Sequence, residues 1–187
     1  MPTSSKHGKT PTKQWILENK NSINRILDVG CGEGTYPKLI SKGGWGDLSE
    51  IILPDAEWWG FEAWQPYISQ YNLENIYNHL INEDVRKYDF TQLPDFDLVI
   101  FGDVLEHMTK EEAQELVNKA LDKSKFVLIS IPIKHMPQGA VHGNPFEEHV
   151  KDNWTNREVL ESFPNIVKYD TGSKIGVYWL EATNKNI

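Results

Sequence analysis

Short apolar runs alternate with amphipathic segments along most of the chain. Runs of about four to eight apolar residues bounded by turn residues are typical of buried strands. The clearest run, 96–101 (FDLVIF), is almost continuously apolar, as expected for a strand covered on both faces of a parallel sheet. The pattern predicts strands at 25–29 (RILDV), 57–62 (EWWGFE), 76–82, 96–101, 125–131 (KFVLISI), 165–169 and 174–181.

Helices are predicted between these strands from apolar residues at helical spacing and from capping residues. Thr109 and Thr155 each precede such a segment and can accept a hydrogen bond from the free N–H groups of its first turn. The pattern predicts helices from Thr10 or Thr12 to about Lys20, and at 35–41, 65–72, 110–122 and 156–163.

Alternation of strands and helices, followed by a terminal hairpin, predicts one α/β domain over residues 1–187. We expect an open, mostly parallel sheet with an antiparallel edge. Residues 1–10 are expected to form a flexible arm. The stretch 132–153 is long, irregular and rich in Pro, Gly, His and Asn, so it is predicted to be a binding loop or lid.

Charge and cysteine content narrow the classes of function. A net charge of −8 argues against a broad nucleic-acid-binding surface, and we interpret the basic residues near the start as a solvated tail: Lys6, His7, Lys9 and Lys13. Cys31 is the single cysteine, which excludes an internal disulfide and a cysteine-based zinc site and fits a reducing, cytoplasmic setting. No apolar run approaches the ~20 residues that span a bilayer, and residues 1–13 lack the apolar core of a secretory signal.

Chemistry-bearing residues follow four predicted strands at their carboxyl ends, where parallel α/β sheets bind ligands. The turn 30–34 (GCGEG) follows the first strand, and its glycines let the backbone approach a ligand. Glu62 can accept hydrogen bonds from two ribose hydroxyls, Asp84 can meet an adenine amino group, and Val85 can form an apolar wall. Together these strand ends predict an adenosine-binding site.

The glycine spacing separates two kinds of adenosine cofactor. A dinucleotide site favours G-x-G-x-x-G or G-x-G-x-x-A, with an acidic residue about 20 positions later. This chain has Gly30, Gly32 and Gly34 with Thr35 next, and its acidic Glu62 comes later. A nucleotide that carries a pyrophosphate is therefore disfavoured.

Two segments carry a resemblance to a known family. Residues 28–34 (DVGCGEG) resemble the first motif of class I S-adenosylmethionine-dependent methyltransferases, and 96–108 (FDLVIFGDVLEHM) resembles the fourth-strand motif of their small-molecule branch. The resemblance implies a Rossmann-like sheet of seven strands, mostly parallel, with an antiparallel C-terminal hairpin strand and helices on both faces. It also implies S-adenosylmethionine as cofactor and the following binding residues: Asp28, Gly30, Cys31, Gly32, Gly34, Glu62, Ala63, Asp84, Val85, Gly102 and Asp103.

The acceptor side is expected to lie near His107 and the loop 132–153, and His107 and His149 are the predicted catalytic residues. His107 is the candidate general base, although it could instead support the following helix. His149 could face the acceptor or make a structural hydrogen bond.

A metal site is the alternative for this region. Asp103, Glu106, His107 and His149 resemble the Glu-x-x-Glu-His…His ligands of metal-dependent RNA 3′-end 2′-O-methyltransferases. An aspartate replaces the first glutamate, the acidic balance of the chain is wrong for RNA, and the Glu106-His107 pair is also common in methyltransferases without a metal, so we expect no metal.

The sequence thus predicts O-methylation of a small-molecule or saccharide-like acceptor by an enzyme that does not act on nucleic acid or at a membrane. The alternatives are an RNA ribose 2′-O-methyltransferase with a metal site and a non-catalytic S-adenosylmethionine-binding regulatory module. The pattern does not indicate an oligomeric state.

Overall fold

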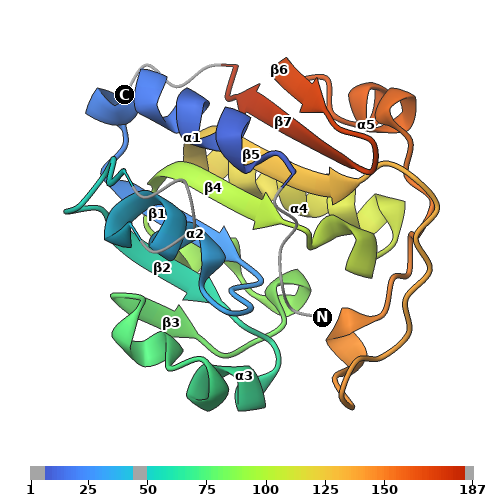
Figure 1. The fold of residues 1–187 in the computed structure, drawn as a ribbon, viewed down its shortest axis with the longest axis horizontal. Coiled ribbons are helices and arrows are strands. Elements are labelled where there is room, and N and C mark those ends of the chain that lie inside the picture. Colours follow the sequence, from blue (N-terminus) through green and yellow to red (C-terminus); the bar gives the residue numbers. More distant parts are fainter. Residues whose placement is uncertain (1–6, 44–49, 184–187) are drawn as a thin grey trace.

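A single seven-stranded sheet organises the chain (Figure 1). The computed structural model describes residues 7–43 and 50–183. The strand order is β3-β2-β1-β4-β5-β7-β6, in which β7 runs antiparallel to both of its neighbours and every other pair is parallel. This confirms the predicted fold class. The strands are β1 (Arg25–Val29), β2 (Glu57–Phe61), β3 (His79–Ile81), β4 (Phe96–Gly102), β5 (Ser124–Pro132), β6 (Ile166–Thr171) and β7 (Ile175–Glu181).

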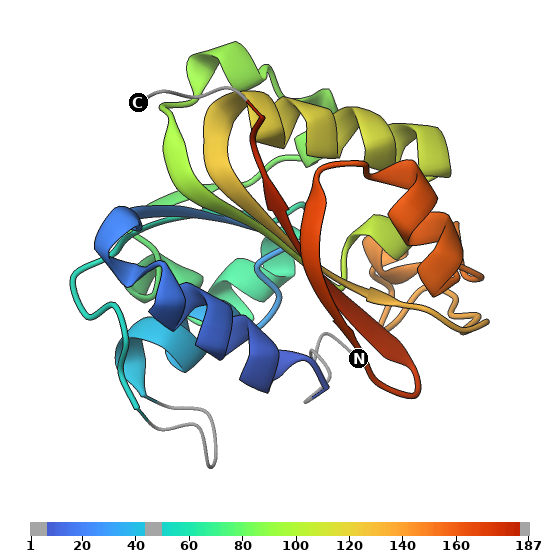
Figure 2. The ribbon, with the colours of Figure 1, turned by 90° about the horizontal axis from the view of Figure 1, so that it is seen from above.

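The helices cover both faces of the sheet (Figure 2). Side chains from α1 and α2 pack on one face, in a core that includes Ile16, Tyr36 and Trp179. Those from α4 and α5 pack on the other, in a core that includes Val117, Val159 and Phe101. The helices are α1 (Lys9–Glu18), α2 (Thr35–Pro37), α3 (Gln65–Gln70), α4 (Lys110–Lys123) and α5 (Asn156–Ser162).

Helix α4 forms as its sequence predicts. The Thr109 hydroxyl accepts a hydrogen bond from the Glu112 amide at 3.2 Å, and the Glu112 carboxylate accepts one from the Thr109 amide at 2.8 Å. This reciprocal cap satisfies two N–H groups that the first helical turn leaves unpaired. Thr155 caps α5 in the predicted way, accepting from the Glu158 amide at 3.1 Å.

The start of the chain differs from the prediction. Neither Thr10 nor Thr12 caps α1, which begins at Lys9 after Gly8 in a left-handed conformation. Lys9 and Lys13 are buried, so their interpretation as part of a solvated tail is wrong, as is the expected arm at residues 8–10. Residues 1–6 of that arm, including Lys6, lie outside the described residues.

Two further elements are shorter than predicted. The helix expected at 35–41 is α-helical only over Thr35–Pro37 and continues as a π-helical turn, Lys38–Lys42. The strand expected at 76–82 is reduced to β3, because the chain before it forms a 3₁₀ turn, Leu73–Asn75, that directs Tyr77 into the core. Apart from one 3₁₀ turn, Pro145–Glu147, the loop 132–153 is irregular after β5 ends, as predicted. Over residues 7–43 and 50–183, no helix combines the length and apolar character needed to cross a membrane.

The strand order reverses between β1 and β4, which are neighbours although β2 and β3 separate them in sequence. A crevice forms at such a reversal, outside the carboxyl ends of the strands, because the connections leave in opposite directions. The predicted binding residues follow β1, β2, β3 and β4, so the topology brings them to this edge.

Gly60 in β2 lies in a tightly packed layer of side chains beneath this edge of the sheet. A Cβ atom at Gly60 would lie 2.5 Å from Cys31 Sγ and 2.9 Å from the Tyr77 ring, and both neighbours are buried. We expect Gly60→Ala to lower the free energy of unfolding by about 1–3 kcal/mol, the usual cost of overpacking. Urea titration measures it. Gly139→Ala, where a Cβ would meet no atom within 4 Å, is the control and should change stability little. Equal effects of the two substitutions would contradict the packing argument.

Candidate functional site

A cavity of about 400 Å³ opens at the carboxyl ends of the central strands, and its walls include the last residues of β1, β2 and β4: Val29, Phe61 and Gly102. Its volume lies in the range of about 300–1,000 Å³ typical of small-molecule sites. Every binding or catalytic residue predicted from the sequence lines it, except Asp28 and Gly34.

The glycine-rich turn is held against the end of β2. The amides of Gly30 and Cys31 both donate to the Phe61 carbonyl, each at 2.9 Å. Gly30, Gly32 and Gly34 have φ of 73°, 50° and 74°, in the left-handed region that favours glycine. The backbone of the turn can therefore form part of the cavity wall, as predicted.

Gly34 is not among the residues that line the cavity. A Cβ atom there would lie 3.0 Å from Ile76, away from the cavity, and Gly34 directly precedes α2. The residue allows the chain to enter the helix.

Glu62 joins the turn to the end of β2. Its side chain is buried, and its two carboxylate oxygens accept from the Gly32 amide at 3.1 Å and the Trp64 amide at 2.8 Å. Burial raises the pKa of Glu62 to about 7, although both amides oppose this shift. A carboxylate has about four lone-pair sites, so the ionised group can accept two more hydrogen bonds from a ligand.

Asp84 occupies the predicted place after β3. Its carboxylate caps a 3₁₀ turn, Val85–Lys87, by accepting from the Arg86 amide at 3.1 Å, and it also accepts from the Arg86 guanidinium at 2.9 and 2.7 Å. Bonds to Arg86 hold the pKa of Asp84 below its usual value against the effect of burial. Sequence reasoning missed Arg86, although a basic side chain two residues after an N-cap aspartate is a local signal that could have indicated it.

Asp28 lies beneath the cavity. It is fully buried and its Oδ2 accepts a hydrogen bond from the Tyr77 hydroxyl at 2.6 Å. Burial raises the pKa of Asp28 to about 8. Asp28 is not among the residues that line the cavity, and it supports the turn from below, so its contact with a cofactor stays a prediction.

A second buried ionisable group, Lys9, comes from α1. Lys9 donates to the Tyr36 hydroxyl at 2.8 Å, with its ammonium 4.2 Å from the centre of the Tyr36 ring. Burial lowers the pKa of Lys9, while Asp103 and Asp28 favour its charged form. Tyr36 and His7 line the cavity, so the start of the chain contributes to the site in a way that no sequence pattern indicated.

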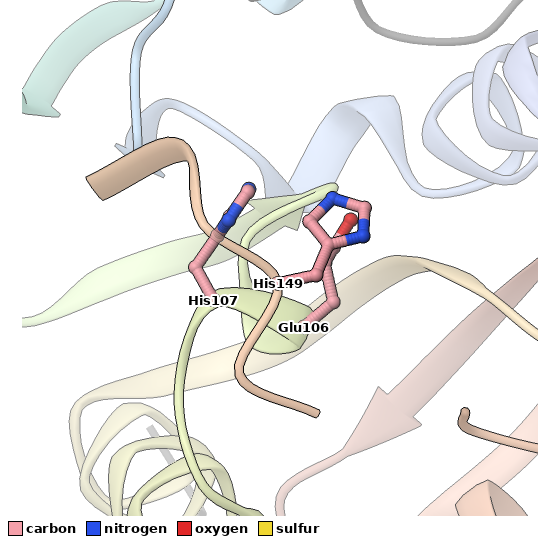
Figure 3. Close-up of side chains that lie close together, drawn as sticks. All are labelled: Glu106, His107 and His149. Atoms are coloured by element: carbon pink, nitrogen blue, oxygen red, sulfur yellow. The ribbon is translucent and has the colours of Figure 1, made fainter. Parts of the chain in front are cut away.

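His107 and His149 lie together at the end of the cavity formed by the loop 132–153 (Figure 3). Their ring centres are 4.9 Å apart. Nδ1 of His107 is 3.0 Å from the Glu148 carbonyl oxygen, and Nδ1 of His149 bonds the Met136 carbonyl. A ring nitrogen that contacts a carbonyl oxygen donates its proton to that oxygen, so in the neutral form of either ring the lone pair is on Nε2. Burial lowers the pKa of His107, which favours this neutral form.

Glu106 precedes His107 in a 3₁₀ turn, Leu105–His107, and is 2% exposed. Burial raises its pKa well above the usual value. One ligand atom of Glu106 and one of each histidine lie within 4.8 Å of one another. The structure thus brings together three of the four residues of the metal alternative. Asp103 lies outside that cluster, and its Oδ1 accepts from the Ser130 hydroxyl at 2.8 Å.

The loop 132–153 forms one side of the cavity. One backbone hydrogen bond lies within the loop, where the His149 amide donates to the Gln138 carbonyl at 2.9 Å. Another joins the loop to the turn after β4, where the Lys151 amide donates to the Glu106 carbonyl at 3.0 Å. The Tyr67 hydroxyl of α3 donates to Glu147 at 3.2 Å and connects the loop to the opposite wall. Gln138, Glu147 and Asn144 supply polar groups to the cavity.

Comparison with solved structures shows which fold this is. The N-terminal domain of EvdMO1 with SAH bound matches with a TM-score of 0.65 and 16% identity, over 96% of this chain and 82% of that chain. Magnesium protoporphyrin IX methyltransferase from Synechocystis PCC 6803 with bound SAH matches with a TM-score of 0.64 and 13% identity, over 94% of this chain and 82% of that chain. An S-adenosylmethionine-dependent methyltransferase from Clostridium acetobutylicum matches with a TM-score of 0.65 and 12% identity, over 94% and 91%.

No family model matches the chain, and no curated protein matches its sequence. At these identities the structural likeness establishes the fold alone, which is that of class I S-adenosylmethionine-dependent methyltransferases.

The buried acids make stability depend on pH. The pKa is about 8 for Asp28 and about 7 for Glu62 in the folded chain, and about 4 for such groups when unfolded. Between these values the folded state keeps protons that the unfolded state has released. The free energy of unfolding should therefore fall as pH rises from about 4 to 8, by up to about 1.4 kcal/mol per pH unit for each group.

Asp28→Asn tests this linkage, since asparagine can still accept from Tyr77 and carries no titratable proton. Urea titrations between about pH 5 and pH 8 should give a shallower decline in the variant than in the wild type. Substitution of the exposed Asp170 by asparagine is the control and should leave the slope unchanged. An unchanged slope in Asp28→Asn would show that Asp28 is already ionised over this range.

Proposed function

We propose that this chain is an S-adenosylmethionine-dependent methyltransferase that methylates a hydroxyl oxygen of a small-molecule, saccharide-like acceptor. The observation that carries the proposal is the arrangement of one cavity. Two acidic strand ends, Glu62 and Asp84, lie with the glycine-rich turn in its wall, and His107 and His149 lie together at the end formed by the loop 132–153.

The donor set of the cavity fits an adenosine cofactor. Glu62 would bind the ribose hydroxyls with the lone pairs that Gly32 and Trp64 leave free. Asp84 would accept from the adenine amino group beside the apolar Val85, and the backbone of the turn would border the rest of the cofactor. Solved structures of the same fold, including the N-terminal domain of EvdMO1, were obtained with SAH bound.

Bound S-adenosylmethionine supplies an electrophilic methyl group on a positively charged sulfur and leaves as the neutral thioether. The acceptor hydroxyl oxygen forms the new bond to carbon while the carbon–sulfur bond breaks, and the hydroxyl proton must leave. His107 or His149 would accept that proton on its Nε2 lone pair. The loop 132–153 would align the acceptor and exclude water.

Several features support a small polar acceptor. Gln138, Asn144 and Glu147 bring hydrogen-bonding groups into the cavity, and Phe146 adds an aromatic ring there. The EvdMO1 domain was also crystallised in the presence of SAH and D-fucose. The net charge of −8 weighs against an RNA acceptor. The paired histidines weigh against a purely regulatory, non-catalytic module.

Glu62 gives a prediction for cofactor binding. Glu62→Gln should weaken SAH binding by about 1–3 kcal/mol, or roughly 5- to 150-fold, because bonds to an ionised acceptor are lost. The wild-type affinity should also fall below pH 7, by up to about tenfold per pH unit, because protonated Glu62 loses a lone pair to the proton. Titration calorimetry with SAH at several pH values measures both effects.

The variant should lose the pH dependence together with the affinity. Glu74→Gln, at an exposed glutamate outside the cavity, is the matched control and should bind SAH as the wild type does. Tight, pH-independent binding by Glu62→Gln would contradict the assignment of Glu62 to the ribose.

The reaction itself is tested with methyl-labelled S-adenosylmethionine and a panel of hydroxyl compounds that includes sugars and their nucleotide conjugates. We expect label transfer to a saccharide or similar alcohol, with release of SAH, and no transfer to RNA. His107→Ala should lower kcat by at least about 100-fold, since proton removal contributes on that order, with SAH affinity nearly unchanged. Failure to bind either S-adenosylmethionine or SAH would overturn the proposed function.

A further inference from the structure

Three side chains of metal-ligand type converge at the acceptor side of the cavity (Figure 3). Glu106 and His107 come from the turn after β4, and His149 comes from the loop 132–153, so the fold brings two distant segments together. All three line the cavity, which gives an ion a route of entry. Among residues 7–43 and 50–183, no other set of histidine, cysteine and acidic residues gathers in this way.

Both histidines are oriented as metal ligands are. Each Nδ1 contacts a backbone carbonyl, that of Glu148 for His107 and that of Met136 for His149. Metal-ligating histidines almost always donate their other ring N–H to such a group, which fixes the tautomer and the ring orientation. The Nε2 lone pairs of the two rings remain for an ion.

Glu106 supplies an independent observation. Its side chain is 2% exposed, and its Oε2 has no hydrogen-bond partner. An unpaired polar atom in so buried a position is costly, and a buried charge is normally paired or bound to a metal. The ammonium of Lys151, whose amide donates to the Glu106 carbonyl, bonds Glu158 at 3.1 Å instead. The Oε2 atom is therefore a ligand position that the protein itself leaves unfilled.

We propose that Glu106, His107 and His149 bind one divalent transition-metal ion of the zinc, cobalt, manganese or iron class, whose remaining coordination positions take the acceptor hydroxyl. This proposal rests on the proposed function for the identity of the oxygen ligand, but not for the ion itself. The ligand set replaces the sequence-based expectation of no metal, and it omits Asp103.

The types of ligand atom indicate which class of ion the site would bind. Two imidazoles and one carboxylate suit zinc, iron and related ions, whereas magnesium and calcium prefer oxygen ligands alone. Ligand atoms about 2.1 Å from a tetrahedral ion lie about 3.4 Å apart. The three atoms here lie within 4.8 Å of one another, so binding requires a contraction that rotation of the side chains can supply.

An ion at this place would promote loss of the acceptor hydroxyl proton, which a histidine would otherwise remove as a base. It lowers the pKa of a coordinated hydroxyl, so that the proton passes to solvent and the oxygen is left as the nucleophile for the methyl group. The two histidines then act as ligands. The buried carboxylate of Glu106 lies beside the two histidines. A mechanism in which a histidine acts as the base has no use for this carboxylate, whereas a metal site uses it as a ligand, so its position favours the ligand role.

Metal uptake by the whole chain tests the site directly. Protein made without a histidine tag and stripped with a chelator is dialysed against Zn²⁺, Co²⁺ or Mg²⁺, and bound metal is measured. We expect about one Zn²⁺ or Co²⁺ per chain, visible ligand-field bands for Co²⁺, and little Mg²⁺. Glu106→Gln and His149→Ala should each weaken Zn²⁺ binding by at least about tenfold, since even outer partners of a metal ligand contribute that much.

The matched control is His142→Asn, which removes an imidazole from the same loop outside the cavity, at a positive φ that asparagine tolerates. It should bind Zn²⁺ as the wild type does. SAH titration of every variant confirms that the cofactor end is folded. If Glu106→Gln does not fold, His149→Ala decides, since its side chain is carried by a loop.

The outcomes separate this site from the proposed function. SAH binding without uptake of Zn²⁺ or Co²⁺, or equal uptake by the wild type and the folded ligand variants, would overturn the metal site and leave the methyltransferase. Metal uptake that is lost in the variants, without any binding of SAH, would support the ion and overturn the methyltransferase.

Discussion

The Phe61 carbonyl accepts hydrogen bonds from the amides of Gly30 and Cys31, both at 2.9 Å, at the point where β2 ends. This pair of bonds holds the glycine-rich turn across the top of the sheet, and Glu62, the next residue, closes the junction by accepting from Gly32. The turn can sit there because its glycines adopt a left-handed backbone that most side chains would strain. If the turn moved away from β2, the cavity would lose its wall and Glu62 would lose a buried hydrogen bond. The position of the whole site therefore depends on a backbone contact between two neighbouring strand ends.

Three buried carboxyl groups lie in or beneath the cavity and make the site acidic. Asp28 lies under the turn, Glu62 at one wall of the cavity and Glu106 beside His107, and burial raises the pKa of all three. Groups of this kind destabilise the fold when they ionise without a partner. A ligand that is positively charged, or rich in hydroxyl donors, offsets that cost, and a sulfonium cofactor and a divalent ion both meet the requirement. The acidity of the site thus favours the ligands that we propose and disfavours a phosphate-rich acceptor.

Much of the fold could be predicted because its signals are local. The apolar runs that became β1 and β4, the caps of α4 and α5, and the acidic residue after β2 are each visible within a few positions of the sequence. The failures arose from contacts between distant segments. Lys9 is buried because it bonds Tyr36 at the far side of β1, and β3 is short because Tyr77 reaches back to Asp28. The orientation of the two histidine rings could not be predicted for the same reason, since it depends on carbonyls that the loop 132–153 brings to the rings.

Asp103 lies outside the proposed metal ligands but fixes the conformation of the turn that carries two of them. It has a φ of 58°, a left-handed conformation that costs a non-glycine residue roughly 1–2 kcal/mol. Two hydrogen bonds to Ser130 stabilise this conformation. The Ser130 carbonyl accepts from the Asp103 amide at 2.8 Å, and the Ser130 hydroxyl donates to the Asp103 carboxylate at 2.8 Å. The strained turn ends β4 abruptly and leads directly into Leu105–His107. Strain of this kind persists where surrounding contacts enforce it, typically at functional sites. Here the neighbouring strand β5 supplies those contacts, so Asp103, which lies outside the cluster of Glu106, His107 and His149, still determines where Glu106 and His107 lie.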